Sequence, residues 1–350
     1  MSEKRKRILN LLEEGHITAE EADRLLETLD EEDGDDKKED NYFHSDFKKD
    51  VRSFTAGVKN FLDDTFNRIK DGPFEFNFSH MNVRREYEFS ANDVDYFHFD
   101  LASTSIEILP EISNKIRIEC RAKVFKETDQ AKAEKLFNRN VEINVEQNTL
   151  HVESPNKHIQ TELVIYLPKK QYDKASFNSV NGSIKIRSAQ FNQASVSTVN
   201  GSIQISDYVG DAFYVETKHG SIKLDDVQLS KAKLSTSAGS VYVDGNVEQL
   251  NIDVVTGSVR SYIRNVAAKM VHIQSVTGSV QLYVPNNAPL VGTASTTVSS
   301  VDIQLENIKK HHLDEQITKK LVQFSNTEGQ DYLDIDLSTK TGSIRVYPLS

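Results

Sequence analysis

Few side chains in this 350-residue sequence have the types and spacing that catalysis requires. The best candidate for acid–base chemistry is the pair Asp225 and Asp226 beside Lys223, because enzymes that cleave polysaccharides place two carboxylates close together. Both aspartates fall where the chain is expected to turn between strands, so we interpret them as exposed turn residues. We therefore expect no catalytic residues, and we predict that the protein is not an enzyme.

The metal-binding and phosphate-binding patterns are also missing from the sequence. His311 and His312 form an adjacent pair that no residue at helical or strand spacing completes into a metal site. The single cysteine, Cys120, is incompatible with an intrachain disulfide or a cysteine-based zinc site. Each Gly-Ser step joins strand to strand, whereas a phosphate-binding loop leads into a helix. We expect no metal site, no cofactor and no small-molecule substrate.

The strongest signal is a repeated turn of the form x-Gly-Ser-Ile/Val, which indicates a repeat architecture. Successive glycines in its main run are 19, 19, 19, 18 and 21 residues apart. A further copy lies at Gly342, and a degenerate copy has Ser299 in place of the glycine, where we expect strain. The glycines of the main run are Gly182, Gly201, Gly220, Gly239, Gly257 and Gly278.

Other residues recur in step with this glycine. Apolar residues stand two and four positions after it and five and seven before it, and this spacing of two predicts strands with one inward face. Three positions before the glycine stands a serine or threonine in every copy but one, where Val254 takes its place. We predict a ladder of these hydroxyls, and a glycine with a positive φ or no room for a Cβ. The sequence thus predicts a mainly β protein, a parallel β-solenoid with about 19–21 residues per coil.

Weaker alternation upstream extends the predicted solenoid. Residues 97–108 follow the same plan without its glycine, and shorter alternating runs follow. Two segments, residues 126–139 and 307–321, have a helical pattern, and we expect them to leave the solenoid as outward loops. The second of these accounts for the long gap before Gly342.

The N-terminal part predicts helices rather than strands. Residues 18–21 form a capping box that opens the second helix of a short hairpin. A later helix has apolar residues at heptad-like spacing, and three interpretations remain open: a cap on the solenoid, an oligomer seam or a membrane-surface helix. The predicted domains are a helical hairpin at 1–30, an acidic linker at 31–43, an amphipathic helix at 44–72 and the β-solenoid at 73–350.

Charge and hydropathy limit the classes of partner and the cellular location that we expect. Acidic residues outnumber basic residues by 53 to 42, and the resulting net charge of −11 opposes binding to a nucleic-acid backbone. The chain has no apolar run suited to a secretory signal or a membrane span. From these patterns we expect a cytoplasmic protein, or one peripheral at the inner membrane face.

Three segments together resemble one bacterial family. Residues 15–22 resemble the SHOCT-like domain that begins YvlB-like proteins, residues 61–70 resemble the helix that follows it, and the Gly-Ser turns after residues 163–168 resemble the family's β-strand-repeat region. The resemblance implies a repeat region that carries an adhesin label, and a link to envelope-stress responses in Gram-positive bacteria. It implies no catalytic residues.

Three functions remain open on this basis. The leading one is a non-catalytic scaffold that self-associates through its N-terminal helices, binds a membrane-associated protein and acts in the cell-envelope stress response. The alternative is a surface adhesin or carbohydrate-binding rod. A remote alternative is a polysaccharide-active enzyme that uses Asp225 and Asp226.

Overall fold

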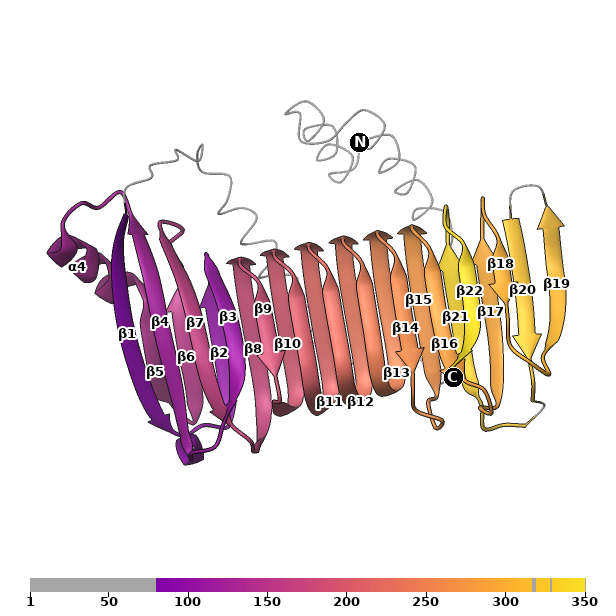
Figure 1. Ribbon diagram of the computed structural model, residues 1–350, viewed down its shortest axis with the longest axis horizontal. Helices are drawn as coiled ribbons and strands as arrows, with labels where there is room; N and C mark the ends of the chain where they lie inside the picture. The colour runs from indigo at the N-terminus through magenta and orange to yellow at the C-terminus, as the bar shows by residue number, and fades with distance from the viewer. Residues whose placement is uncertain (1–79, 317–318, 328, 350) are drawn as a thin grey trace, which may run out of the picture. The chain divides into compact units, whose positions relative to one another are not determined.

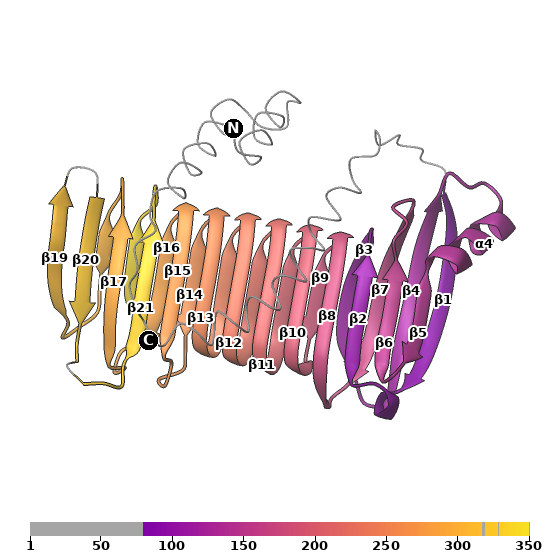
Figure 2. The same ribbon diagram turned by 180° about the vertical axis from the view of Figure 1, so that it is seen from behind.

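The structure is a computed structural model that describes residues 80–316, 319–327 and 329–349 of the chain. The predicted hairpin at 1–30, the linker at 31–43 and the helix at 44–72 lie outside these residues. The predicted mainly β fold and parallel solenoid are confirmed, because strands that run side by side form one continuous sheet of 22 strands (Figures 1 and 2).

This sheet folds over into two layers that enclose a thin apolar core. The alternating residues predicted to face inward are buried, with Ile203, Val215 and Ile222 at 2% exposure or less. In spatial order the first layer contains β5 (Glu142–Glu146), β6 (Thr149–Ser154), β2 (Tyr96–Leu101), β8 (Gln171–Asn181), β10 (Gln190–Asn200), the later parts of β11 (Ile203–His219), β12 (Ile222–Ala238) and β13 (Val241–Thr256), then β15 (Met270–Thr277), β21 (Leu333–Thr339), β17 (Leu290–Thr296), β20 (Lys319–Ser325) and β19 (Lys309–Gln316). The second layer contains β1 (His80–Ser90), β4 (Lys115–Phe125), β7 (Ile159–Pro168), β3 (Thr104–Glu111), β9 (Ile184–Arg187), the first parts of β11, β12 and β13, then β14 (Val259–Ile263), β16 (Val280–Pro285), β22 (Ile344–Leu349) and β18 (Val301–Ile303).

The repeated glycine forms the corner at which each coil crosses from the first layer to the second. A Cβ on Gly220 would lie 2.0 Å from the carbonyl oxygen of Gly201 in the preceding coil, and the same close approach recurs along the stack. Gly257 and Gly278 also have φ angles of +148° and +143°, which side chains rarely allow. Glycine is therefore required here by the approach of successive backbones, as predicted.

The hydroxyl column is also present, and its bonds run to backbone. The Oγ1 atoms of Thr217 and Thr236 each donate to the carbonyl of the glycine one coil earlier, Gly201 and Gly220, at 3.0 Å. The predicted ladder therefore links successive coils through hydroxyl-to-carbonyl bonds. Val254 occupies the same position and has no hydroxyl to offer Gly239.

This column gives a direct test of what holds adjacent coils together. Thr236→Val is expected to lower the free energy of unfolding by about 1–2 kcal/mol, because the carbonyl of Gly220 loses its buried donor. Val254→Thr supplies the missing donor and is expected to raise stability by about 0.5–1.5 kcal/mol. Urea unfolding followed by circular dichroism measures both, and equal stabilities for the wild type and Thr236→Val would contradict the assignment.

A second corner returns the chain to the first layer, and it uses residues other than glycine. Ser188, Asp207 and Asp226 occupy this corner in successive coils with φ angles of 55°, 51° and 52°. The next coil has no residue opposite Asp226, because Asp225 pairs with Asp244 and Val227 pairs with Gly245. Aspartate tolerates the left-handed region better than most residues. The interpretation of Asp226 as a turn residue agrees with this geometry.

The order of coils in space differs from their order in the chain at both ends. The coil made of β2 and β3 lies between β6–β7 and β8–β9, although it precedes both in sequence. At the other end, β21 and β22 lie between β15–β16 and β17–β18, so the last coil of the chain is not the last in the stack. Antiparallel strands then close each end, with β4 on β7 and β20 on β17.

One of the two predicted helical loops is confirmed and the other is wrong. Helix α4 (Gln130–Asn140) lies within the first segment, but it buries Ala133 and Phe137 in the core instead of pointing outward. In the second segment, Lys309–Gln316 form strand β19 and Lys319 begins strand β20, and these two strands pair antiparallel. Pairing of β20 with β17 buries Val322 and Phe324, and this tertiary contact overrides the local helical pattern.

The degenerate turn at Ser299 shows none of the backbone strain that a positive φ would cause. Its backbone does not adopt a positive φ, unlike that of Asp207 or Asp226. The N–H groups of Thr297 and Val298 both donate to the carbonyl of Lys340, at 3.3 and 3.2 Å, just as those of Lys340 and Thr341 at the Gly342 corner donate to the carbonyl of Val276.

Candidate functional site

The two aspartates predicted as the best catalytic candidate lie where strand β12 meets the second corner. Asp225 forms an ion pair with Lys223 at 2.8 Å on the outer side of the second layer. Asp226 lies one residue further, at the second corner, where its positive φ turns it away from the strand. The Lys223 ammonium also lies 5.4 Å from the ring centre of Tyr242. Both carboxylates therefore have structural explanations.

The histidines remain scattered, and within residues 80–316, 319–327 and 329–349 no group of three or more metal-ligating side chains is close enough to hold an ion. His98 and His151 lie side by side on the first layer, with ring centres 5.9 Å apart. His311 is exposed on β19. Cys120 is buried, and burial raises the pKa of its thiol to about 12, so it remains a protonated thiol at neutral pH.

His272 is a histidine with a carboxylate partner. Its Nδ1 lies 3.0 Å from Oδ2 of Asp336 on the neighbouring strand, and this hydrogen bond raises the pKa of His272 against the opposing effect of burial. The negative charges of Asp253 and Asp334 also raise the pKa of His272. The pair lies on the outer surface of the first layer and links β15 to the inserted strand β21.

The His272–Asp336 pair predicts a pH-dependent contribution to stability. Because the folded pKa of His272 lies above its unfolded value near 6.5, the stabilisation is complete below that pH and is lost as pH rises through the folded pKa. At pH 5.5 the free energy of unfolding of the wild type is expected to be higher than that of His272→Asn by up to about 1 kcal/mol. At pH 8.5 this difference in the free energy of unfolding is expected to be smaller. Urea unfolding of both proteins at the two pH values measures this, and a constant difference would contradict it.

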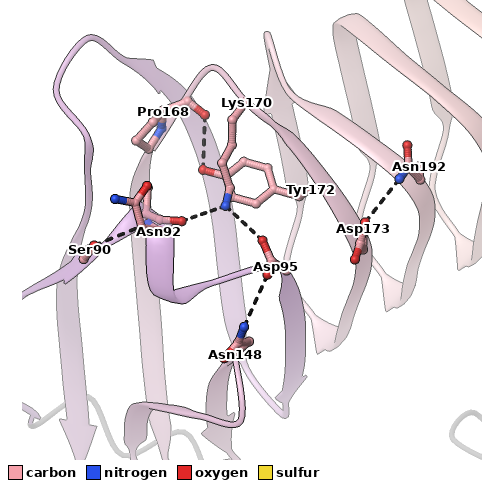
Figure 3. A network of polar contacts seen from close by, with 10 residues as sticks. Ser90, Asn92, Asp95, Asn148, Pro168, Lys170, Tyr172, Asp173 and Asn192 are labelled. Carbon is pink, nitrogen blue, oxygen red and sulfur yellow. Dashed lines mark hydrogen bonds and ion pairs between the residues drawn. The ribbon is translucent and has the colours of Figure 1, made fainter.

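A polar network holds the inserted N-terminal coil in place (Figure 3). The ammonium of Lys170 donates to the carbonyl of Ala91 at 2.7 Å and to the carboxylate of Asp95 at 3.0 Å, and it lies 4.8 Å from the ring centre of Tyr172. On the other side of the same coil, Asn148 donates to Asp95 at 3.4 Å. The hydrogen bond from Lys170 holds the pKa of Asp95 below its usual range. The network therefore joins Asp95 to both neighbouring coils, which is a structural role.

A row of tyrosines crosses the outer surface of the second layer. Tyr262, Tyr283 and Tyr347 are register partners on β14, β16 and β22, and we call them the tyrosine row. Ring centres are 4.3 Å apart for Tyr262 and Tyr283 and 4.9 Å for Tyr283 and Tyr347, with interplanar angles of 13° and 22°. Since the rings stack on one another, their edges and hydroxyls are the groups left for other contacts.

A second row runs beside the first. Arg260, Gln281 and Arg345 are register partners two residues before the tyrosines on the same strands, and we call them the arginine row. Arg260 donates through Nε to Oε1 of Gln281 at 2.9 Å, and both arginines are exposed. Neither arginine forms an ion pair with a carboxylate of the described residues. The two rows together form what we call the Tyr–Arg face.

The Tyr–Arg face was missed by sequence reasoning, although part of its signal is present. The tyrosines all stand five residues after a repeat glycine, and the arginine row stands three after it. The third member of each row comes from the C-terminal coil, which is adjacent only because β22 is inserted between β16 and β18.

No helix in the described part of the chain is long and apolar enough to cross a bilayer.

Solved structures that are similar to this chain include two bacterial proteins. One similar structure, from Bacteroides fragilis NCTC 9343, is described as a "putative adhesin", with 12% identity, a TM-score of 0.43 and coverage of 77% of this chain and 98% of that one. Another, from Parabacteroides distasonis ATCC 8503, is described as a "putative lipid binding protein", with 14% identity, a TM-score of 0.38 and coverage of 77% and 97%.

Sequence comparisons place the chain more firmly. The Bacillus subtilis (strain 168) protein YvlB, described as uncharacterized, is 30% identical over 199 residues, which are 53% of this chain and 54% of YvlB. The chain thus spans about half the length of this curated relative. Residues 3–34 match the SHOCT-like domain, and residues 94–347 match the model described as Toastrack DUF4097. The predicted resemblance is confirmed: the chain belongs to the Toastrack DUF4097 family, with a SHOCT-like domain at its N-terminus.

Proposed function

We propose that this protein is a non-catalytic binding scaffold of the bacterial cell envelope, with the outer surface of its solenoid as the recognition element. The observation that carries this proposal is the Tyr–Arg face, where exposed Arg260 and Arg345 lie in register with Gln281 between them on three adjacent strands. By contrast, Asp95 and Asp225 are engaged in contacts that stabilise the fold. The repeat builds a rigid surface, and its outward positions are free to vary for recognition.

Co-sedimentation of the full chain with cell walls and membranes from bacteria tests this proposal. The protein is expected to bind one of these fractions and to leave the polymers intact over prolonged incubation. Release of new reducing ends that is lost in Asp225→Asn and Asp226→Asn would instead support the enzyme alternative. Failure to sediment with either fraction would contradict the scaffold proposal.

The finer form of this proposal has the scaffold self-associate through the helices at 1–30 and 44–72 and act in the envelope-stress response at the inner membrane face. Its support is the apolar spacing of those segments and the SHOCT-like match at residues 3–34. Light scattering of the full chain and of a Leu25→Asp/Phe61→Asp variant tests it. We expect an oligomer that the variant converts to a monomer, and a monomeric wild type would rule this form out.

The second form is a surface adhesin or carbohydrate-binding rod, and the Tyr–Arg face favours it. Hydroxyl and guanidinium donors spaced along a rigid strand array suit a long polymer with many acceptor oxygens. The two forms differ in location. Protease treatment of intact cells is expected to digest the protein if it is exposed at the surface, and complete protection would favour the cytoplasmic form.

A further inference from the structure

We propose that the Tyr–Arg face binds an acidic linear polysaccharide that lies along the solenoid axis, across strands β14, β16 and β22. This inference rests on the proposed binding function and names the ligand class of the same face. Each of the three coils contributes one tyrosine hydroxyl and one polar or cationic side chain at matching register positions. The face therefore repeats one tyrosine and one polar or cationic side chain on each successive strand.

Charge complementarity favours an anionic ligand. Arg260 and Arg345 are both exposed, and they are the positively charged side chains of this face. The upstream coils carry Lys185 and Lys223 at the same position after the glycine. Asp302 is the register partner of Arg345 on β18 and marks the far end of the row. Guanidinium groups hold carboxylates through paired charge-assisted hydrogen bonds, which suits uronic acids.

Spacing favours an extended polymer. Arg260 and Arg345 are two strands apart, which is about 9.5 Å, and Gln281 lies between them. A pyranose unit extends about as far as one strand spacing. In an extended glycan with a near two-fold screw, alternate sugars face the same side. Carboxylates of alternate uronic acids then meet Arg260 and Arg345, and the intervening sugar meets Gln281.

The tyrosine row provides hydroxyls rather than ring faces. Because Tyr283 stacks on both Tyr262 and Tyr347, both of its ring faces are covered, and each of the outer rings has one face covered by Tyr283. Burial raises the pKa of Tyr283, so its hydroxyl stays protonated and can donate. Bases of single-stranded nucleic acid bind by stacking on successive free aromatic faces. The stacking of Tyr283 between Tyr262 and Tyr347 leaves no such succession of faces. Sugar hydroxyls and ring oxygens need only the donors and acceptors that phenols supply.

The same face lacks the features of a membrane-binding surface. Membrane-surface elements insert large apolar side chains into the lipid. The large hydrophobic residues exposed in the described part of the chain all lie elsewhere: Tyr96, Ile112, Val255, Val266, Val298 and Tyr332. A polar, flat and cationic surface is better suited to a polymer than to a bilayer.

Calorimetric titration of the full chain with oligogalacturonate tests the proposal, with fully methyl-esterified oligogalacturonate as the matched uncharged ligand. We expect binding to the acidic oligomer that weakens as salt rises, and at least roughly tenfold weaker binding to the esterified one. Vesicles of phosphatidylglycerol serve as the lipid comparison. Binding to these vesicles without binding to the acidic oligomer would overturn the proposal in favour of a membrane surface.

Variants locate the site. Arg260→Gln/Arg345→Gln is expected to weaken binding at least roughly tenfold, whereas Lys233→Gln, on the outer surface of the first layer, is expected to leave it unchanged. Asp302→Asn is expected to tighten binding. Replacing all three tyrosines of the row by phenylalanine is expected to weaken binding several-fold with the ring stack retained, and an unchanged melting temperature excludes a folding defect as the cause.

The outcomes separate this inference from the proposed function. If the double arginine variant binds oligogalacturonate as the wild type does, or if the wild type does not bind it, the inference is wrong. Retained sedimentation with envelope fractions would leave the scaffold proposal standing in that case. If the wild type neither binds oligogalacturonate nor sediments with envelope fractions, both the inference and the scaffold proposal are wrong.

Discussion

Gly220→Ala is expected to lower the free energy of unfolding by at least about 3 kcal/mol. The added Cβ would lie 2.0 Å from the carbonyl oxygen of Gly201 and 2.6 Å from its carbon. These atoms belong to backbone that is held in turn by the N–H of Gly201 donating to His219 and by Thr217 donating to Gly201, at 3.1 and 3.0 Å. Relief of the clash therefore requires two coils to separate.

Gly329→Ala is the matched control for this prediction. A Cβ at Gly329 would meet only the Oγ1 of Thr327, at 3.4 Å, which is ordinary contact. Urea unfolding of the two variants is expected to differ clearly, with Gly329→Ala within about 0.5 kcal/mol of the wild type. Equal stability of the two variants would mean that the repeated glycine serves the fold in some way other than close backbone approach.

The repeat was predictable from sequence because its cause is local and is the same in each coil. Each repeated position has the same role in every coil. Gly220 allows the close approach of two backbones, Thr217 donates to a carbonyl of the preceding coil, and Ile222 is buried in the core. Such positions tolerate few residue types, so they remain visible in a single sequence. The second corner was less visible, because Ser188, Asp207 and Asp226 share only tolerance of a positive φ.

The order of the coils was not predictable for the same reason. Each coil presents nearly the same columns at its two faces, so the register of β21 fits β15 and β17 equally well. Chain order alone suggests that Gly342 ends the stack, yet a Cβ on it would lie 1.8 Å from the carbonyl oxygen of Gly278. Only long-range pairing specifies which coil inserts where.

The candidate site depends on this insertion. The five-residue offset of Tyr262, Tyr283 and Tyr347 from their glycines is readable in the sequence, but Tyr347 stands far along the chain from Tyr283. In chain order, the coil that carries Tyr347 is not the neighbour of the coil that carries Tyr283. In the structure, the insertion of β22 beside β16 places Tyr347 next to Tyr283. Because this insertion departs from chain order, the row was not predicted from the sequence.

Phe191→Ala is expected to lower the free energy of unfolding by about 3–5 kcal/mol. Phe191 is fully buried, and its ring centre lies 5.3 Å from that of Phe97 and 5.6 Å from that of Tyr172. Phe97 belongs to the inserted strand β2 and Tyr172 to β8, so the ring fills the junction between the inserted coil and the regular array. Rigid backbone on both sides limits collapse of the cavity.

Two further measurements make this prediction specific. Tyr332→Ala removes an aromatic ring that is 40% exposed, and it is expected to change stability by no more than about 0.5 kcal/mol. Because coils contact only their neighbours, the damage of Phe191→Ala is expected to stay local. Hydrogen exchange followed by mass spectrometry should show faster exchange in β2, β8 and β10 and unchanged exchange in β15 and β21. Uniformly faster exchange along the whole array would show instead that the solenoid unfolds as a single cooperative unit, in which the junction has no special role.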